Sequence, residues 1–170
     1  MLTILLTGGT GFIGKVVLER LLVRDDVKYI YLLVRPKRGK SIEERMQDLR
    51  TSPCFDNVRS EFDRVIGLEG DMVKANLGLQ QKDMELTRST VTHIINLAAA
   101  IDFCLPLAEA TRANVTGALE LLEVAKTCTK LHRLVHCSTA YVSVPKQNDA
   151  SIYEHDPLVL PGNVAQIYNS

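Results

Sequence analysis

Residues 2–14 decide the fold of this chain, and they read LTILLTGGTGFIG. The run before the glycines is apolar and continuous, as expected of a strand buried on both faces of a parallel sheet. Gly8, Gly11 and Gly14 then stand between this strand and a predicted helix. In that setting the first glycine makes a tight turn, the second lets the backbone approach a pyrophosphate, and the third lets helix and strand pack closely. The alternative is a connection without a ligand, but three glycines are costly in conformational entropy unless something needs the space.

The rest of the chain alternates predicted strands with predicted helices. In the first helix, apolar residues at helical spacing are expected to pack on the sheet, namely Ile13, Val16, Val17, Leu21 and Leu22. Ser41 and Glu44 form a capping-box signature for a helix to about Leu49. Another helix is predicted at 107–125, where Leu119, Leu122 and Ala125 recur on one face, and further strands are predicted at 29–34, 64–70, 91–99 and 131–138. This alternation predicts an α/β fold with a doubly wound parallel sheet, the NAD(P)-binding Rossmann fold.

The strand and helix pattern dissolves beyond Pro145. We therefore expect an NADP-binding Rossmann domain over residues 1–145 and an irregular polar segment over 146–170, which leads toward a missing substrate-binding part. On this interpretation the fold is C-terminally truncated. An exposed sheet edge, where the missing strands should pair, then predicts self-association.

Composition and charge limit the kinds of partner. The chain has 170 residues, with 46% hydrophobic and 24% charged, which is typical of one ordinary globular domain. Twenty basic residues balance twenty acidic ones, which argues against a nucleic-acid partner. No apolar run approaches the ~20 residues that span a bilayer, and no leader precedes the first strand, so we expect a soluble intracellular chain without a membrane segment. Neither the cysteines nor the histidines have ligand spacing, so we expect reduced, mostly buried thiols and no metal site.

A basic stretch follows the second predicted strand. An NAD-specific protein usually carries a carboxylate there for the ribose 2′-hydroxyl, whereas this chain has Arg35, with Lys37, Arg38 and Lys40 close behind. A guanidinium can pair bidentately with a 2′-phosphate and stack on adenine, and a carboxylate would repel that phosphate. The pattern predicts NADPH as the cofactor. The alternative is a solvated basic turn, since exposed Lys and Arg are common.

Other candidate residues follow the remaining strands, at the sheet edge where ligands bind in open α/β folds. The alanines after strand four make room for a cofactor, and Asp71 either accepts a hydrogen bond from the adenine amino group or only forms a turn. Ser138 and Thr139 close strand five, where a hydroxyl could steady negative charge on a substrate carbonyl, or mark a turn. The predicted cofactor-binding residues are Thr7, Gly8, Gly9, Thr10, Gly11, Phe12, Ile13, Gly14, Arg35, Lys40, Asp71, Met72, Ala98, Ala99 and Ala100.

Several of these stretches together resemble one family. The glycine motif is similar to that of the extended short-chain dehydrogenases. YLLVRPKRGKS at 31–41, AAAIDF at 98–103 and VHCSTAYV at 135–142 resemble the fatty acyl-CoA reductases, which carry the male-sterility type of NAD-binding domain. NVTG at 114–117 matches the Asn-x-x-Gly of the same group, and the resemblance runs from residue 1 to about residue 145.

The resemblance implies NADPH-dependent reduction of a long-chain acyl-CoA, through an aldehyde, to a fatty alcohol, as in lipid metabolism and wax biosynthesis. In the family a tyrosine acts as general acid beside a lysine, and a Ser or Thr after strand five polarises the carbonyl. Thr139, with Ser138 as the alternative, matches that position, and Asn114 would help to order the site and any water relay. Full-length family members are often found at peroxisomal or endoplasmic reticulum membranes.

The chain departs from the family pattern in two respects. It has no Tyr-x-x-x-Lys, so we expect it to be the cofactor-binding part of the enzyme and inactive alone. Ala118 also stands where the family commonly has threonine. Two alternatives stay open. One is a non-catalytic NADP(H)-binding module, and the other is a related thioester reductase or extended short-chain dehydrogenase.

Overall fold

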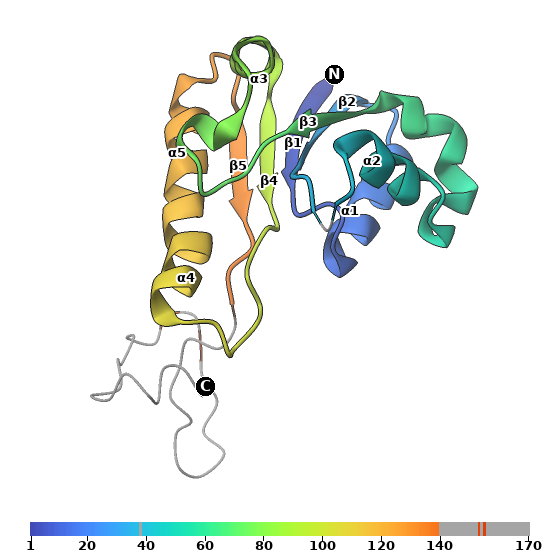
Figure 1. Cartoon of the computed structure of the whole chain (residues 1–170). Helices are drawn as coiled ribbons and strands as arrows, with labels where there is room; N and C mark the ends of the chain where they lie inside the picture. Colours follow the sequence, from blue (N-terminus) through green and yellow to red (C-terminus); the bar gives the residue numbers. More distant parts are fainter. Residues whose placement is uncertain (38, 140–152, 154, 156–170) are drawn as a thin grey trace. The chain divides into compact units, whose positions relative to one another are not determined.

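The computed structural model describes residues 1–37, 39–139, 153 and 155 (Figure 1). The chain divides into two units. The first unit holds residues 1–100 and 106–137, and the second holds 101–105 and 138–170. The predicted irregular segment at 146–170 lies outside the described residues, apart from Tyr153 and His155. All the regular strands and helices described below belong to the first unit.

The first unit is built on a sheet of five parallel strands in the order β3-β2-β1-β4-β5 (Figure 1). The strands are β1 (Leu2–Thr7), β2 (Val27–Val34), β3 (Val65–Glu69), β4 (His93–Asn96) and β5 (Arg133–His136). β1 and β2 are long and buried, whereas β4 and β5 are shorter than the sequence predicted, because only their central residues pair in register. The predicted doubly wound α/β sheet is confirmed, with the change of direction between β1 and β4.

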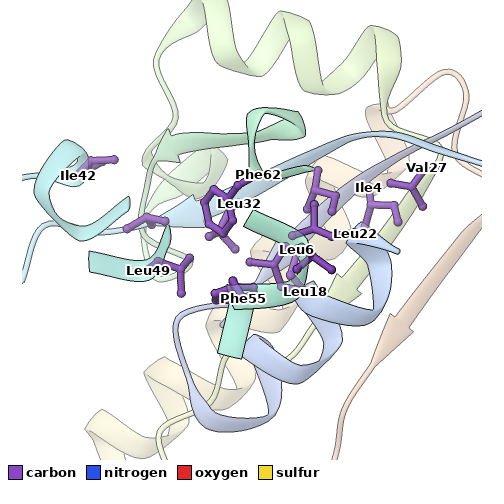
Figure 2. Packing of buried hydrophobic residues seen from close by; sticks show 13 residues of the cluster. Ile4, Leu6, Leu18, Leu22, Val27, Leu32, Ile42, Leu49, Phe55 and Phe62 are labelled. Carbon is purple, nitrogen blue, oxygen red and sulfur yellow. The ribbon is translucent and has the colours of Figure 1, made fainter. Parts of the chain in front are cut away.

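Helices cover both faces of this sheet. One face carries α1 (Phe12–Leu22), α2 (Ile42–Arg50) and the 3₁₀ helix η1 (Pro53–Arg64), and the other carries η2 (Ala75–Gly78), α3 (Gln81–Thr90) and α5 (Gly117–Thr127). Successive residues of β1 point to opposite cores: Ile4 and Leu6 join the first cluster and Leu5 joins the second. Figure 2 shows Leu6, Leu18 and Phe55 meeting in the first core.

The buried face of α1 agrees only in part with the predicted one. Leu22 is buried and Val17 and Leu21 pack against the first core, whereas Ile13 and Val16 are 57% and 50% exposed, and Gly14 and Leu18 are buried in addition. The glycine turn causes this difference. Gly14 must face the turn, because a Cβ on it would lie 2.1 Å from the carbonyl oxygen of Gly8, and the buried stripe then follows at intervals of four residues.

The predicted helix at 107–125 is helical over Leu107–Thr127 but changes type along its length. It runs as α4 (Leu107–Thr111), then a π-helical stretch, η3 (Arg112–Thr116), then α5. Leu119 and Leu122 are 56% and 41% exposed. Their three-residue interval drifts away from the helical repeat, so of the three predicted residues only Ala125 is buried, together with Gly117, Leu121 and Val124.

Two further expectations concern the surface. The prediction of mostly buried thiols is wrong: Cys54, Cys104 and Cys137 are exposed, and only Cys128, at the end of α5, is buried. Burial raises the pKa of the Cys128 thiol. Across the described part of the chain, no helix has the length and apolar character needed to cross a bilayer.

Candidate functional site

The glycine turn brings the ends of β1 and β4 into direct backbone contact. Gly8 has φ of 71°, and a Cβ there would lie 2.6 Å from the amide nitrogen of Ala98. Only glycine tolerates both the left-handed conformation and this approach. The Gly11 amide then donates to the Gly8 carbonyl at 2.9 Å and closes the turn.

The turn leaves the start of α1 open to a ligand. Gly11 is the N-cap and provides no side-chain cap, and the first turn of α1 contains no acidic residue. The first N–H groups of a helix lack intrahelical partners, and the helix dipole favours negative charge there. Phe12 beside them is 90% exposed. This end of β1 is therefore suited to binding a phosphate, as the glycine spacing predicted.

A chain of polar side chains that the sequence analysis missed links three strand ends, and it is buried at Thr7 and Asn96. The Thr7 hydroxyl donates to Asn96 Oδ1 at 2.5 Å, and the Ala98 amide donates to the same Oδ1 at 3.3 Å. Asn96 Nδ2 lies 2.8 Å from Nδ1 of His136, so this imidazole nitrogen is the acceptor. Thr7 and Asn96 are only 1% and 2% exposed. Burial of these groups is tolerated because each has partners, and the chain fixes the ends of β1, β4 and β5 relative to one another.

A cleft of about 530 Å³ lies beyond the end of β2. Nη1 of Arg35 is 4.0 Å from Oδ2 of Asp71, and both residues line the cleft. Asp71 Oδ1 also accepts a hydrogen bond from the Val73 amide at 3.2 Å, so this residue is a turn former as well as a cleft residue. The remaining lining residues are Pro36, Lys37, Glu69, Gly70, Lys74 and Gly78. We call this the Arg35 cleft.

Arg45 is a second residue that the sequence analysis missed. It lies on α2, where the predicted capping box of Ser41 and Glu44 is confirmed. Its guanidinium donates to the Thr10 hydroxyl at 3.2 Å and to the backbone carbonyl of Arg35. Partial burial and the charge of Arg35 lower the pKa of Arg45, against the opposing effect of Asp48. Arg45 therefore ties the glycine turn to the end of β2, a link that spacing along the chain could not reveal.

Lys40, a predicted cofactor residue, lies in a smaller hollow of about 380 Å³ on the α2 side. Its Nζ is 2.5 Å from Oδ2 of Asp48. The hollow is lined by Thr10, Lys15, Lys37, Lys40, Arg45, Asp48 and Leu49, and we call it the basic hollow. Four of these side chains are cationic and one is a carboxylate, so the hollow favours an anion.

The predicted cofactor-binding residues after β3 and β4 differ in their burial and in their contacts. The side chain of Met72 is buried in the core under α5, whereas Ala99 is exposed. Asn114 pairs with the backbone of Ala100 in both directions: Oδ1 accepts from the Ala100 amide at 2.7 Å and Nδ2 donates to its carbonyl at 3.0 Å. This contact from the π-helical stretch holds the loop after β4, and the role of Asn114 in ordering the site and any water relay stays a prediction.

Ser138 and Thr139 belong to the second unit, and β5 ends before them at His136. Both side chains are exposed. Their predicted role at a substrate carbonyl stays a prediction. Among the described residues no group of His, Cys, Asp or Glu side chains is arranged to hold a metal ion.

Comparison with known proteins gives a consistent result. The family model described as male sterility protein matches residues 6–163. Human fatty acyl-CoA reductase 2 is 34% identical over 144 residues, which is 82% of this chain and 28% of that protein. The chain spans only 28% of the length of the first curated relatives that it matches.

Solved structures show the same likeness. The terminal R domain from the myxalamid biosynthetic pathway is 33% identical, with a TM-score of 0.76 over 99% of this chain and 43% of that one. The reductase domain of a nonribosomal peptide synthetase from Mycobacterium tuberculosis is 34% identical, with a TM-score of 0.64 over 82% of this chain and 33% of that one.

Proposed function

The chain belongs to the male sterility protein family, and on that premise we propose that it is the cofactor-binding part of an NADPH-dependent reductase. The reductase converts a long-chain fatty acyl-CoA to a fatty alcohol through the aldehyde. The observation that carries the proposal is the open start of α1 at the glycine turn, next to the Arg35 cleft. The name of the human relative supports the substrate class.

NADPH is proposed over NADH because of the charge around the end of β2. Arg35 can pair with the 2′-phosphate and stack on the adenine, and Lys37 and Lys40 add positive charge nearby. Asp71 faces Arg35 across the cleft, where it could accept a hydrogen bond from the adenine amino group. The two side chains are 4.0 Å apart, and Arg35 is 57% and Asp71 24% exposed, so the pair adds little stability and Arg35 is available to a ligand.

The residues of this chain would divide the work of the reaction. The cofactor supplies the hydride when it is bound. The glycine turn and the start of α1 hold its pyrophosphate, and the loop held by Asn114 leaves room beside the alanines after β4. Reduction of a thioester carbonyl places negative charge on its oxygen. The hydroxyl of Thr139, or of Ser138, would donate a hydrogen bond to that oxygen and stabilise the charge.

A binding experiment tests the cofactor proposal, because cofactor binding does not require the tyrosine that acts as general acid in the family. The chain is titrated with NADPH and NADH by calorimetry, together with Arg35→Ala. We expect a preference for NADPH of about 10-fold or more, or roughly 1.4 kcal/mol, which the variant loses. Arg20→Ala is the matched control, because Arg20 is an exposed cation near the end of α1. Equal affinity for the two nucleotides in the unmodified chain would contradict the NADPH proposal.

The substrate proposal needs the longer polypeptide. A reading frame that continues past Ser170 and contains Tyr-x-x-x-Lys would exclude a non-catalytic binding module. The longer chain should then consume NADPH with a long-chain acyl-CoA. The likeness to reductase domains of peptide synthetases favours a second candidate, a reductase of other thioesters. NADPH consumption with a short acyl thioester, but not with the long-chain acyl-CoA, would favour this candidate.

A further inference from the structure

The side-chain hydrogen bonds that link the ends of β1, β4 and β5 fit together in only one way. The Ala98 amide is a fixed donor, so the Asn96 atom that lies 3.3 Å from it must be Oδ1. The same Oδ1 accepts from the Thr7 hydroxyl at 2.5 Å. The other atom of the Asn96 amide is then Nδ2, which can only donate, and it lies 2.8 Å from Nδ1 of His136. This orientation of the Asn96 amide needs an acceptor on the β5 side, and His136 provides it.

The sheet register places His136 beside Asn96. The two residues are partners in the parallel pairing of β4 and β5, and the Cys137 amide donates to the Asn96 carbonyl at 2.9 Å. Asn96 is 2% exposed, so solvent is a poor substitute for His136 as the acceptor for Nδ2. The His136 side chain itself is exposed, so its second ring nitrogen can be hydrated. Loss of the imidazole acceptor would therefore leave a buried donor on Asn96 unpaired.

The Ala98 amide, at the far end of these hydrogen bonds, lies where the glycine turn meets β4. A Cβ on Gly8 would lie 2.6 Å from the Ala98 nitrogen and 2.7 Å from the Leu97 carbonyl oxygen, so the turn rests directly on this backbone. The Gly11 amide in turn donates to the Gly8 carbonyl. Because the two backbones are in contact without free space, a displacement of Ala98 also displaces the glycine turn.

Without an acceptor on β5, the Asn96 amide has two unfavourable arrangements. In the first, Nδ2 stays unpaired in a buried position. In the second, the amide turns over and Nδ2 faces the Ala98 N–H, which is another donor. The Thr7 hydroxyl can change from donor to acceptor, but a backbone amide cannot. In both arrangements the backbone next to the glycine turn is held less firmly.

We propose that His136 is a positioning residue for cofactor binding: its Nδ1 holds the Asn96 amide in the orientation that fixes the Ala98 backbone against the glycine turn. This inference rests on the proposed NADPH-binding function and adds a residue to it. His136 acts through Asn96 and not by contact with the cofactor.

The test compares two substitutions that differ in the acceptor. The chain, His136→Leu and His136→Asn are titrated with NADPH by calorimetry. The asparagine Oδ1 branches from Cγ as Nδ1 does, whereas leucine branches there without an acceptor. We expect His136→Leu to bind NADPH about tenfold more weakly and His136→Asn to recover most of the affinity. His136→Val, with a β-branched side chain suited to a strand, replaces the leucine variant if that variant fails to fold.

Hydrogen exchange at the Ala98 amide in the ligand-free chain is a second readout. Exchange should accelerate in His136→Leu and stay nearly unchanged in His136→Asn, because only the leucine variant loses the support for the Asn96 amide. His132→Leu is the control for both measurements. His132 is also an exposed histidine, and it directly precedes β5, at the opposite end of the strand from His136.

Two results would overturn this inference alone. Equal weakening of NADPH binding by both His136 substitutions would show that the acceptor is not what matters. Unchanged NADPH affinity in the leucine variant, whether or not exchange accelerates, would show that His136 does not position the cofactor site. If the unmodified chain does not bind NADPH, the proposed function fails and this inference fails with it.

Discussion

The helices α1 and α5 lie on opposite faces of the sheet, and each buries a glycine near its start (Figure 1). The neighbours of Gly14 are backbone atoms: an added Cβ would lie 2.1 Å from the carbonyl oxygen of Gly8 and 2.6 Å from the Cα of Gly9. The nearest neighbour of Gly117 is the Cβ of Met72, at 3.3 Å. The first glycine therefore allows a backbone crossing with no room for a methyl group, whereas at the second a methyl group would need Met72 to shift by only a few tenths of an ångström.

Replacing the two glycines by alanine should separate these cases, and it gives the largest effect that we predict. Gly14→Ala should lower the free energy of unfolding by about 3 kcal/mol, because backbone on both sides of the new methyl group must move. Gly117→Ala should change it by less than about 1 kcal/mol, because a shift of Met72 is offset by the better helix propensity of alanine. Urea unfolding of both variants measures the difference. Equal losses of unfolding free energy would mean that the contact at Gly117 is as rigid as the one at Gly14. The two faces of the sheet would then not differ in this respect.

The same contrast explains how much of the fold the sequence could predict. On the α1 face the signals for the turn and the start of α2 are local, and the glycine spacing and the Ser41 capping box identified both correctly, although Ile13 and Val16 of the predicted α1 stripe are exposed. On the α5 face the buried stripe depends on where the π-helical stretch ends and on contact with Met72, which is distant in sequence. Leu119 and Leu122, an apolar pair on one predicted face, are therefore exposed.

The residues of the candidate site also differ in whether local sequence signals could identify them. The glycine turn and Arg35 could be found because each follows a strand directly. Asn96 and Arg45 could not be found, because Asn96 depends on the register of three strands and Arg45 depends on how α2 lies against the glycine turn. For Asn96, the only available sequence signal was that a polar residue ends a buried strand.

Asn114 provides a test of intermediate size, because it is the side chain by which the π-helical stretch holds the loop after β4. Asn114→Ala should lower the free energy of unfolding by about 1 kcal/mol, since two hydrogen bonds are lost but the groups are exposed to water. Hydrogen exchange at the Ala100 amide should accelerate at the same time. Asn57→Ala, an exposed asparagine in η1, is the control. Unchanged exchange at Ala100 would show that the loop is held by other contacts.

The smallest predicted effect is a pH dependence located at the start of β4. The pKa of His93 lies below its usual value, first because of partial burial and then because His132 and Arg133 are near, while Asp26 acts in the opposite direction. The two imidazole rings are 6.1 Å apart. The unfolded chain therefore binds more protons than the folded chain from about pH 6.5 down to the lowered pKa, and stability should fall as the pH drops through that window.

Urea unfolding at pH 7.5 and at pH 5.5 measures this dependence, and His93→Gln should reduce the fall in stability between them. Asp26 and Glu43 do not confuse the comparison, because their pKa values are lowered and they titrate at more acidic pH. His132→Gln should have a smaller effect of the same sign, because it removes one neighbouring charge and leaves the burial of His93 in place. If both variants keep the full pH dependence, it arises outside the pair of His93 and His132.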